Sequence, residues 1–500
     1  MVPVRRDLRL LPAATLGWAA AFTGVRLGAV PALLLLIGLL ALTGAAGARL
    51  RRPPGGRHRR STHGRAAATV LLTGAAATLL TGWSWVRADT RAAVVEPHLR
   101  TTVTAVLRVD SEPRMLSGDR ALLRATWVGV GSVGGPSAPL VPVPVTVLAD
   151  GSWMAVVVGS RVQATVRVAA TVPGEESAAL LVAQMPAGLV ARAPPVAAAV
   201  ASLRAGLVAA TAGLDAQARG LVPGIALGDD RALPVTLADD LRTVSLTHVT
   251  AVSGAHVAMV VGLVLVALRR LPRPWQAVLG ALVLAALVVL VHPTASVLRS
   301  AAMGGVLLVG LLLGRPRAAL PALWASVLVL LAIDPWLAGS FGFVLSVLAT
   351  AGLLLASGPL ADRLTRWLPR SAALALAVPM AAQLACTPAL ALLQPAMPVH
   401  GVLANVLAAP AVPPATVLGL VATLLAPVSP AAAQVLASWA GVATAWVASV
   451  ATWCAALPLA TVPWWAAVLA GGAALLLRLG WRRRPANSAL RPGRRREVAG

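Results

Sequence analysis

Long apolar runs alternate with short loops over most of the chain. A transmembrane helix needs about 20 consecutive, mostly apolar residues. Three such runs open the sequence, at residues 10–28, 30–48 and 67–83. Nine more candidates lie at residues 247–268, 275–291, 296–314, 319–333, 341–357, 372–393, 401–427, 431–456 and 461–478. The pattern predicts a polytopic α-helical membrane protein with about 12 transmembrane helices, a number that re-entrant segments can change by about one or two.

Residues 84–195 follow a different period. Apolar and polar positions alternate in residues 102–109 and 162–168, which is typical of half-buried strands. Turn-forming residues punctuate the region at 131–136 and 149–152. We expect a small β domain here, of which a barrel is one form. Its ten Arg and eight acidic residues nearly cancel, so it is no electrostatic funnel for DNA.

Arginines cluster in loops that one topology places on the same side of the membrane. Residues 50–65 are dense in Arg, which predicts a cytoplasmic loop and puts the β domain outside the cytoplasm. The same parity makes the later clusters cytoplasmic, as well as both termini. These clusters are Arg269, Arg270, Arg273, Arg315, Arg317, Arg363, Arg366, Arg370 and the arginines of the tail.

The composition indicates that lipid is part of the solvent of this protein. It also weakens nucleic-acid binding as the explanation of the positive charge. The chain is 58% hydrophobic and 12% charged, against about 25% charged residues in a soluble domain. Its formal net charge of +25 comes from Arg alone, since it has no Lys, and topology accounts for much of it. The basic total is therefore weak evidence for nucleic-acid binding. Cys386 and Cys454 lie in apolar segments and fit small core residues better than a disulfide or metal pair. The N-terminus fits a retained membrane segment better than a cleaved signal peptide.

Polar residues at membrane depth gather first in residues 241–256. Small residues at helical spacing there favour close helix packing, which explains the Ser and Thr. For His248 and His256, packing and function stay open. Ser253 and His256 could approach on one helix, but spacing supplies no third catalytic group, and no third metal ligand stands at a recognised spacing. We therefore expect neither an enzyme nor a metal or cofactor site.

A second set of polar residues lies in the later apolar segments. Arg299 stands in the outer third of one segment, where it needs a partner or a wet cavity, unless it snorkels to the interface. Gln383 and Asn405 lie around Pro-broken segments, and the Pro-rich residues 408–414 interrupt a helix at depth. Together these positions predict a polar path through the membrane.

Four motifs in order resemble those of the ComEC family of competence proteins. The turn at residues 228–231, followed by the segment 248–257, resembles the first signature, in which G-D-x-R precedes H-L-L-A-V-S-G-L-H. Residues 296–299 resemble its S-x-x-R-A segment, and residues 334–346 resemble the region ending in G-F-Q-L-S. The closing Q-L-A…N…P pattern matches Gln383, Asn405 and Pro410. The likeness covers residues 195–430.

The resemblance implies a cytoplasmic-membrane channel that imports single-stranded DNA during natural transformation. It implies an OB-like extracytoplasmic β domain inserted after the third helix, and pore residues that shape the path without breaking bonds. Carried over onto this sequence, the motif residues are Asp229, Arg231, His248, Ser253, Gly254, His256, Arg299, Ser346, Gln383 and Asn405.

The sequence departs from the family pattern at several points. Val344 stands where Gln is usual, Ala255 where Leu is usual, and Ser300 where Ala is usual; the first weakens a pore hydrogen bond. Many members end in a metallo-β-lactamase-like nuclease domain with an H-x-H-x-D-H motif, and none of the seven His here has that spacing. We expect no nuclease activity from this polypeptide.

The resulting organisation has five parts. These are N-terminal transmembrane helices (1–83), the extracytoplasmic β domain (84–195), amphipathic surface helices (196–246), the competence-type transmembrane channel domain (247–480) and a basic cytoplasmic tail (481–500). The expected partners are single-stranded DNA, the lipid bilayer, DNA-delivery proteins outside, and a separate nuclease or helicase/ATPase; an oligomer is compatible with the sequence. A transporter of another polymer or lipid on the same scaffold is the alternative, and an intramembrane hydrolase is a third reading.

Overall fold

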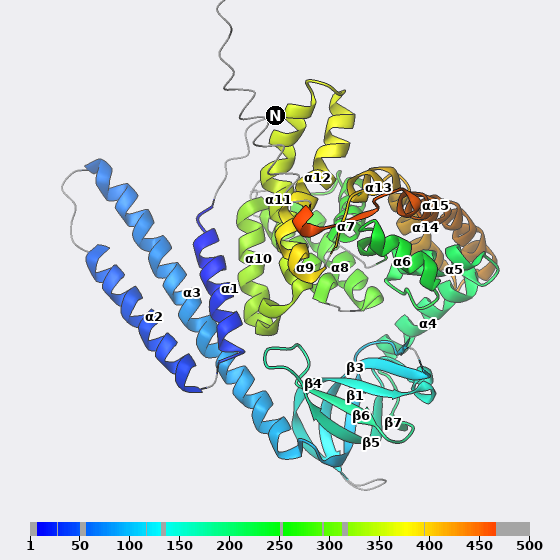
Figure 1. The fold of residues 1–500 in the computed structure, drawn as a ribbon, viewed down its shortest axis with the longest axis horizontal. Coiled ribbons are helices and arrows are strands. Elements are labelled where there is room, and N and C mark those ends of the chain that lie inside the picture. Colours follow the sequence, from blue (N-terminus) through cyan, green and yellow to red (C-terminus); the bar gives the residue numbers. More distant parts are fainter. Residues whose placement is uncertain are drawn as a thin grey trace, which may run out of the picture.

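A computed structural model of the protein describes residues 8–27, 29–50, 57–116, 118–131, 137–250, 254–292, 295–312, 319–394 and 396–466. Three N-terminal helices lead into a β region, and the remaining helices form a bundle above it (Figure 1). The predicted cytoplasmic tail lies outside the described residues.

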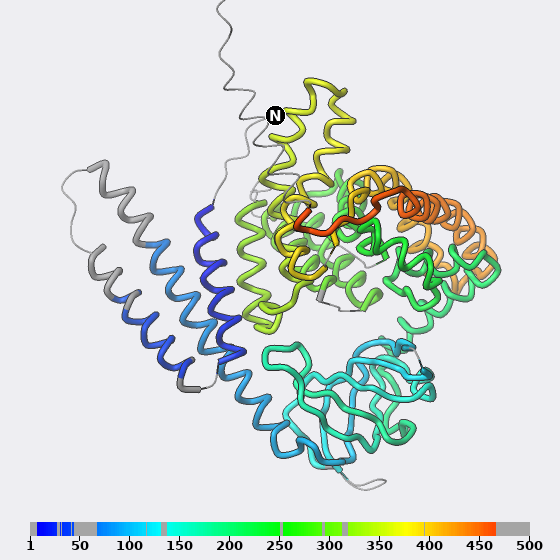
Figure 2. The backbone as a smooth tube through the Cα atoms, in the orientation of Figure 1, coloured from blue at the N-terminus to red at the C-terminus, as the bar shows by residue number. Residues whose placement is uncertain are grey.

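The N-terminal helices are α1 (Leu11–Gly24), α2 (Ala29–Leu50) and α3 (Arg57–Val95). They lie side by side, and α3 continues into the β region through the short helix η1 (Glu96–His98) (Figure 2). Glycines permit the close approach of α1 to α3, because a Cβ atom on Gly24 would collide with the side chain of Ser84.

The β region is a closed ring of five strands with two short additions. Strand β1 pairs with both β3 and β5, and the order β1-β3-β4-β6-β5 returns to β1; β4 and β6 are parallel, and the other pairs are antiparallel. Apolar side chains alternate into a core that contains the fully buried Trp127 and Trp153. The predicted strand-forming region is thereby confirmed as barrel-like. The strands are β1 (Thr102–Val109), β2 (Arg114–Leu116), β3 (Arg120–Gly131), β4 (Ser137–Asp150), β5 (Arg161–Ala170), β6 (Ala179–Ala183) and β7 (Gly188–Ala191).

Three helices follow the β region: α4 (Pro195–Thr211), α5 (Ala216–Leu227) and α6 (Val235–Thr243). The sequence predicts surface helices here, but most of α5 is buried against α14 and α15. The reason is small-residue packing, since a Cβ on Gly419 would press on the methyl group of Ala226.

The bundle contains helices of unequal length. They are α7 (Gly254–Ala267), α8 (Arg273–Val291), α9 (Ala295–Leu312), α10 (Ala319–Ile333), α11 (Phe341–Leu364), α12 (Arg370–Leu393), α13 (Gly401–Ala408), α14 (Val412–Leu425) and α15 (Pro430–Ala456). Short helical turns η3 (Thr247–Val249) and η4 (Pro335–Gly339) precede α7 and α11. A small antiparallel pair, β8 (Ala396–Pro398) with β9 (Thr461–Pro463), joins the approaches to α13 and the end of the described chain.

Five described helices are long and apolar enough to cross a bilayer, and the bent pair α13–α14, with an angle of 53°, makes a sixth if it counts as one span. Four apolar helices are shorter, namely Pro195–Thr211, Gly254–Ala267, Ser296–Leu312 and Ala319–Ile333. At about 1.5 Å per residue these fall short of the roughly 30 Å hydrocarbon core. The membrane character of the chain agrees with the sequence, whereas the count of about 12 crossings stays a prediction.

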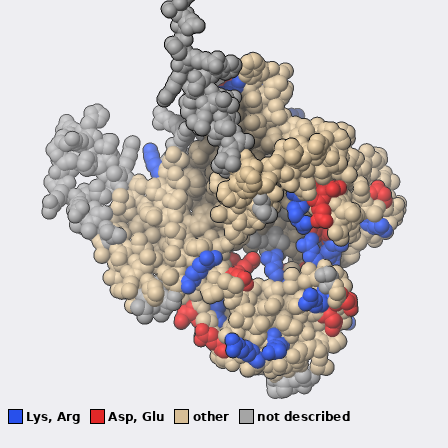
Figure 3. All heavy atoms as spheres, viewed as in Figure 1, with Lys and Arg blue, Asp and Glu red and all other residues tan. Residues whose placement is uncertain are grey.

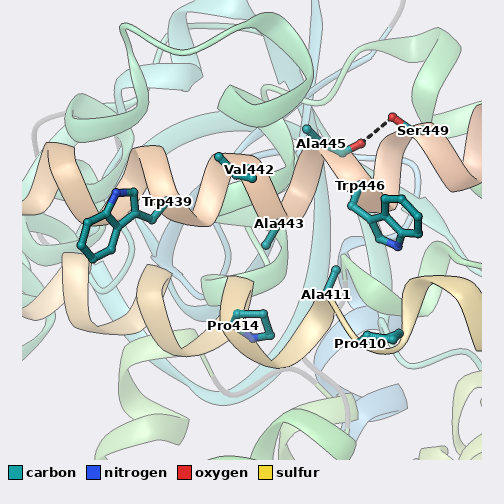
Figure 4. Close-up of a pocket in the computed structure, with 9 residues that line it drawn as sticks. All are labelled: Pro410, Ala411, Pro414, Trp439, Val442, Ala443, Ala445, Trp446 and Ser449. Atoms are coloured by element: carbon teal, nitrogen blue, oxygen red, sulfur yellow. Dashed lines mark hydrogen bonds between the residues drawn. The ribbon is translucent and has the colours of Figure 1, made fainter.

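The break between α13 and α14 is stabilised by a side chain from α15. Pro410 lies in the break, and Trp446 donates its indole N–H to the carbonyl oxygen of Leu407 at 2.8 Å. A shallow apolar groove lies beside this contact, between α14 and α15 (Figure 4). Its lining residues are Pro410, Ala411, Pro414, Trp439, Val442, Ala443, Ala445, Trp446 and Ser449, none of which the sequence predicts as a site residue.

Replacing Trp446 with Phe removes a donor from a helix break in apolar surroundings. We expect the variant to insert normally and to lose about 1–2 kcal/mol of unfolding free energy, because the Leu407 carbonyl is left unsatisfied. Thermal unfolding in detergent micelles, followed by circular dichroism, measures the loss. Trp439→Phe is the matched control, seven residues earlier on α15 and similarly exposed. Equal destabilisation by both variants would contradict the assigned role.

Candidate functional site

The first predicted site residues lie in the turn after α5. Gly228 adopts φ 72°, a left-handed conformation that ends the helix and turns the chain into Asp229. Arg231 donates two hydrogen bonds to the carboxylate of Asp229, from Nε at 2.8 Å and from Nη2 at 2.6 Å. The sequence-predicted pair is therefore a two-pronged ion pair, with Asp229 buried.

This pair belongs to a larger charged network that joins the β region to the helices. Arg204 on α4 is only 4% exposed, and its guanidinium binds both carboxylate oxygens of Glu112, at 2.9 and 3.2 Å. The same guanidinium donates to the carbonyl oxygens of Leu227 and Leu290. Arg231 Nη2 reaches Glu112 at 3.0 Å. Two carboxylates, Glu112 from the β1–β2 loop and Asp229 from the turn after α5, thus face two arginines from the helical part.

The network holds Glu112 ionised. Burial alone would raise the pKa of Glu112, but contacts with His292 and Arg204 and the positive charges of Arg204 and Arg231 outweigh it and lower the pKa to about 2. A second ion pair, between Arg114 and Asp230, runs parallel to the first across the same junction. On the face seen in Figure 3, basic and acidic groups lie over the β region and where it meets the helices.

The histidines of the second motif belong to different elements. His248 lies in the turn η3, with Nδ1 3.0 Å from the carbonyl oxygen of Ser245, whereas His256 is buried in α7. The span predicted at residues 247–268 differs in its first part, where the turn η3 stands before α7 begins at Gly254. Ser253 lies outside the described residues. In the part of the chain that is described, no three His, Cys, Asp or Glu side chains gather around a point that fits a metal ion.

Arg299 lies deep in the protein at the meeting of α9 and α11. Only 5% of its surface is exposed, and its terminal nitrogens lie 3.8 and 3.9 Å from where a Cβ atom of Gly342 would be. The guanidinium therefore lies in van der Waals range of Gly342. Gly254, at the start of α7, faces the Ser300 hydroxyl in the same way, at 3.5 Å. Three of the four motifs meet along this line of contacts.

The Nε atom of Arg299 is buried without a hydrogen-bond partner among the described residues. An unsatisfied donor on a buried cation is costly in protein and is expected only where water or a ligand can reach it.

No hydrogen bond or ion pair among the described residues joins the remaining predicted site residues to either group. Ser346 is half-buried on α11, and Gln383 is half-buried on α12. Asn405 donates its side-chain N–H to the carbonyl oxygen of Gly401, one turn back in its own helix, at 2.7 Å. The structure therefore brings together Asp229 with Arg231, and Gly254 with Ser300, the residue after Arg299.

Several charged residues at the junction are not among the site residues predicted from the sequence. Glu112 has no local signal, since it stands in an ordinary loop of the β region. Arg204 does carry one, because it is the single charge within the apolar helix α4. Arg91, near the end of α3, stacks over the ring of Trp336 in η4, with its guanidinium 3.1 Å from the ring centroid. Arg91 also donates to the carbonyl oxygen of Glu176, in the loop between β5 and β6, at 3.0 Å.

Comparison with known proteins gives one family. The family model described as "Competence protein" matches residues 225–484, just over half of the chain. No curated protein and no solved structure matches. The matched range includes all the predicted site residues, whereas Glu112, Arg204 and the β region precede it.

The buried network predicts a large penalty for removing one partner. Glu112→Gln removes the carboxylate that binds Arg204 directly and leaves it only the Asp229 carboxylate, 3.9 Å away, and we expect a loss of about 3 kcal/mol in unfolding free energy. Tryptophan fluorescence of the protein during thermal unfolding in micelles measures it. Asp239→Asn is the control, since its ion pair with Arg242 is exposed and contributes little. A loss no larger than that of the control contradicts the network's importance.

The same contribution depends on pH. The pKa of Glu112 falls from an ordinary 4.5 to about 2 on folding, so its stabilisation is complete above about pH 5 and disappears as the pH falls from 4.5 toward 2. We expect the difference in melting temperature between wild type and Glu112→Gln to be constant from pH 5 to 7 and to shrink below pH 4. A difference that stays constant down to pH 3 would show that Glu112 is not the titrating group.

Proposed function

This chain belongs to the competence protein family, and from that premise we propose that it conducts single-stranded transforming DNA across the cytoplasmic membrane. The family match supports a role in natural competence, and the apolar helices support a membrane protein. The import of a DNA strand is supported by the buried Arg299 and by the strand order of the β region.

The burial of Arg299 is the observation that best supports this function. A guanidinium buried among apolar helices is retained at a cost, and such residues mark ion and substrate paths in membrane proteins. Its Nε, which has no hydrogen-bond partner among the described residues, suits a polyanion that passes this point. The contacts of Arg299 with α11 and of Ser300 with Gly254 support a path between α7, α9 and α11.

The β region fits an approach to this path. A closed five-stranded ring whose strand order runs β1-β3-β4-β6-β5 supports the OB-like assignment, and OB-folds bind oligonucleotides on their strand face. The parity of the Arg clusters supports an extracytoplasmic position for the ring, with both termini in the cytoplasm. We propose DNA-delivery proteins outside, and a nuclease or helicase/ATPase on other chains, as partners.

Uptake measured in a deletion strain tests the proposal. We expect loss of this protein to abolish transfer of a labelled strand into the cytoplasm while leaving DNA bound outside. Normal cytoplasmic uptake would refute the channel function. An altered envelope in a strain with unchanged uptake would favour transport of another polymer or a lipid.

A single substitution tests the path within the protein. Arg299→Ala should reduce transformation by at least about tenfold, because the strand loses its buried counter-charge, with normal amounts of protein in the membrane. Transformation frequency and membrane immunoblots of the complemented strain give both readouts. Arg269→Ala, in the exposed loop between α7 and α8, is the matched control and should transform normally. Equal effects of the two variants would remove Arg299 from the path.

A further inference from the structure

Helix α15 carries a stripe of exposed side chains whose spacing alternates between four and three residues. We call this stripe the α15 seam, and its members are Val435, Trp439, Val442, Trp446, Ser449 and Trp453. Two helices that pack along their length make contact through a seam with this spacing, which repeats every seven residues. A tryptophan opens each repeat, and the three are 59%, 53% and 54% exposed.

Contact with lipid alone does not explain tryptophans at this spacing. Trp439 and Trp453 are 14 residues apart, which is about 21 Å along the helix, whereas tryptophans that face lipid gather at the two membrane–water interfaces. Helix α8 shows that ordinary pattern, because its one tryptophan, Trp275, lies near its start, and Leu282 and Val289 are exposed further along. The α15 seam instead has the composition of a protein contact, where tryptophan is enriched.

The shape of the surface beside the seam also suits a facing helix. Trp439 and Trp446 flank the groove between α14 and α15, with Ala443 and Pro414 between them (Figure 4). A hollow between two large side chains is what a side chain of a neighbouring helix enters when paired helices interlock. The sequence of α15 contains no charged residue, so two such surfaces approach each other without repulsion.

A second copy of this chain matches the seam. Copies inserted in one membrane have the same orientation, so two α15 helices run parallel about a twofold axis, and each residue of the seam meets its own counterpart. The exposed tryptophans and valines of the seam offer roughly 600 Å² per copy and about 1,200 Å² for a pair, which reaches the lower limit of a specific protein interface. Close contact of this kind is what holds helices together in lipid.

We propose that the α15 seam is a dimer interface, through which two copies of this chain pair side by side in the membrane. The inference goes beyond the proposed function and does not depend on DNA as the cargo. The seam lies on α15, whereas Arg299 lies where α9 meets α11, so pairing leaves the surroundings of Arg299 within each copy.

Cysteine cross-linking of the full-length protein in its membrane locates the contact. Cys386→Ala and Cys454→Ala remove the native cysteines, and Val442→Cys places a single cysteine in the seam. A short bismaleimide should link at least about tenfold more of this variant into dimers than of the control Leu282→Cys, because pairing holds the two cysteines at a high effective concentration. The control position is 61% exposed on α8, against 73% for Val442.

The cross-linked product decides between the occupants of the seam. Equal yields from Val442→Cys and Leu282→Cys, or no product from Val442→Cys, would leave the seam to lipid and overturn the proposal. A product in which mass spectrometry finds a different protein would overturn it as well.

Replacing tryptophans tests whether the seam holds the pair together. Trp439→Leu with Trp453→Leu keeps α15 apolar, so insertion into the membrane is retained, and Trp446 stays because its indole N–H binds the Leu407 carbonyl. We expect the double variant to raise the dissociation constant of the dimer at least about tenfold, measured by energy transfer between labelled copies diluted in phosphatidylcholine vesicles. Trp275→Leu, at a position 60% exposed on α8, is the control and should leave the constant unchanged. Equal constants for the double variant and the control would contradict the interface.

A further variant separates this inference from the proposed function. Arg299→Ala should dimerise as the wild type does, since the seam does not include it. Wild-type cells that import no DNA would refute the channel and leave the dimer interface standing.

Discussion

The fold depends on how the buried charge of Arg204 is neutralised. Moving a guanidinium out of water costs several kcal/mol, and Glu112, with the carbonyl oxygens of Leu227 and Leu290, offsets that cost. Because Glu112 comes from the β region and Arg204 from the helices, the pair fixes one body against the other. That placement in turn sets where the β5–β6 loop meets the helices. The contact of Glu176 with Arg91 depends on this placement of the β region against the helices.

Inside the bundle, the helices are held together by close packing at small residues. Lipid gives helices no hydrophobic reason to associate, so they depend on close contact and on polar pairs. Gly352 on α11 lies against the backbone of Ala381 on α12, and Gly220 on α5 lies against the backbone of Leu233. These contacts explain why α5, which its sequence suggests for a surface, is buried.

Local pattern predicts the elements better than it predicts their partners. Alternation in residues 102–109 is enough to expect a strand, but the pairing of β1 with both β3 and β5 joins residues about 20 and 60 positions apart, and no local signal encodes it. Apolar residues from 247 onward predict one span to residue 268, yet the first part forms the turn η3, and α7 begins at Gly254. Arg299 was identifiable because a charge at membrane depth is anomalous wherever its neighbours lie. Glu112 and Glu176 were not, since an acid in a loop is ordinary until its partners are known.

Arg204 and Arg299 are buried to the same degree, and only their compensation differs. The guanidinium of Arg204 binds both carboxylate oxygens of Glu112 and two backbone carbonyl oxygens, so each of its three nitrogens has a hydrogen-bond partner within the chain. Arg299 forms no ion pair among the described residues, and its Nε has no hydrogen-bond partner there. A buried cation that is fully compensated holds a structure together. One that is only partly compensated keeps its attraction for an anion from outside, and for that reason Arg299, and not Arg204, is the residue at which a DNA strand would be held.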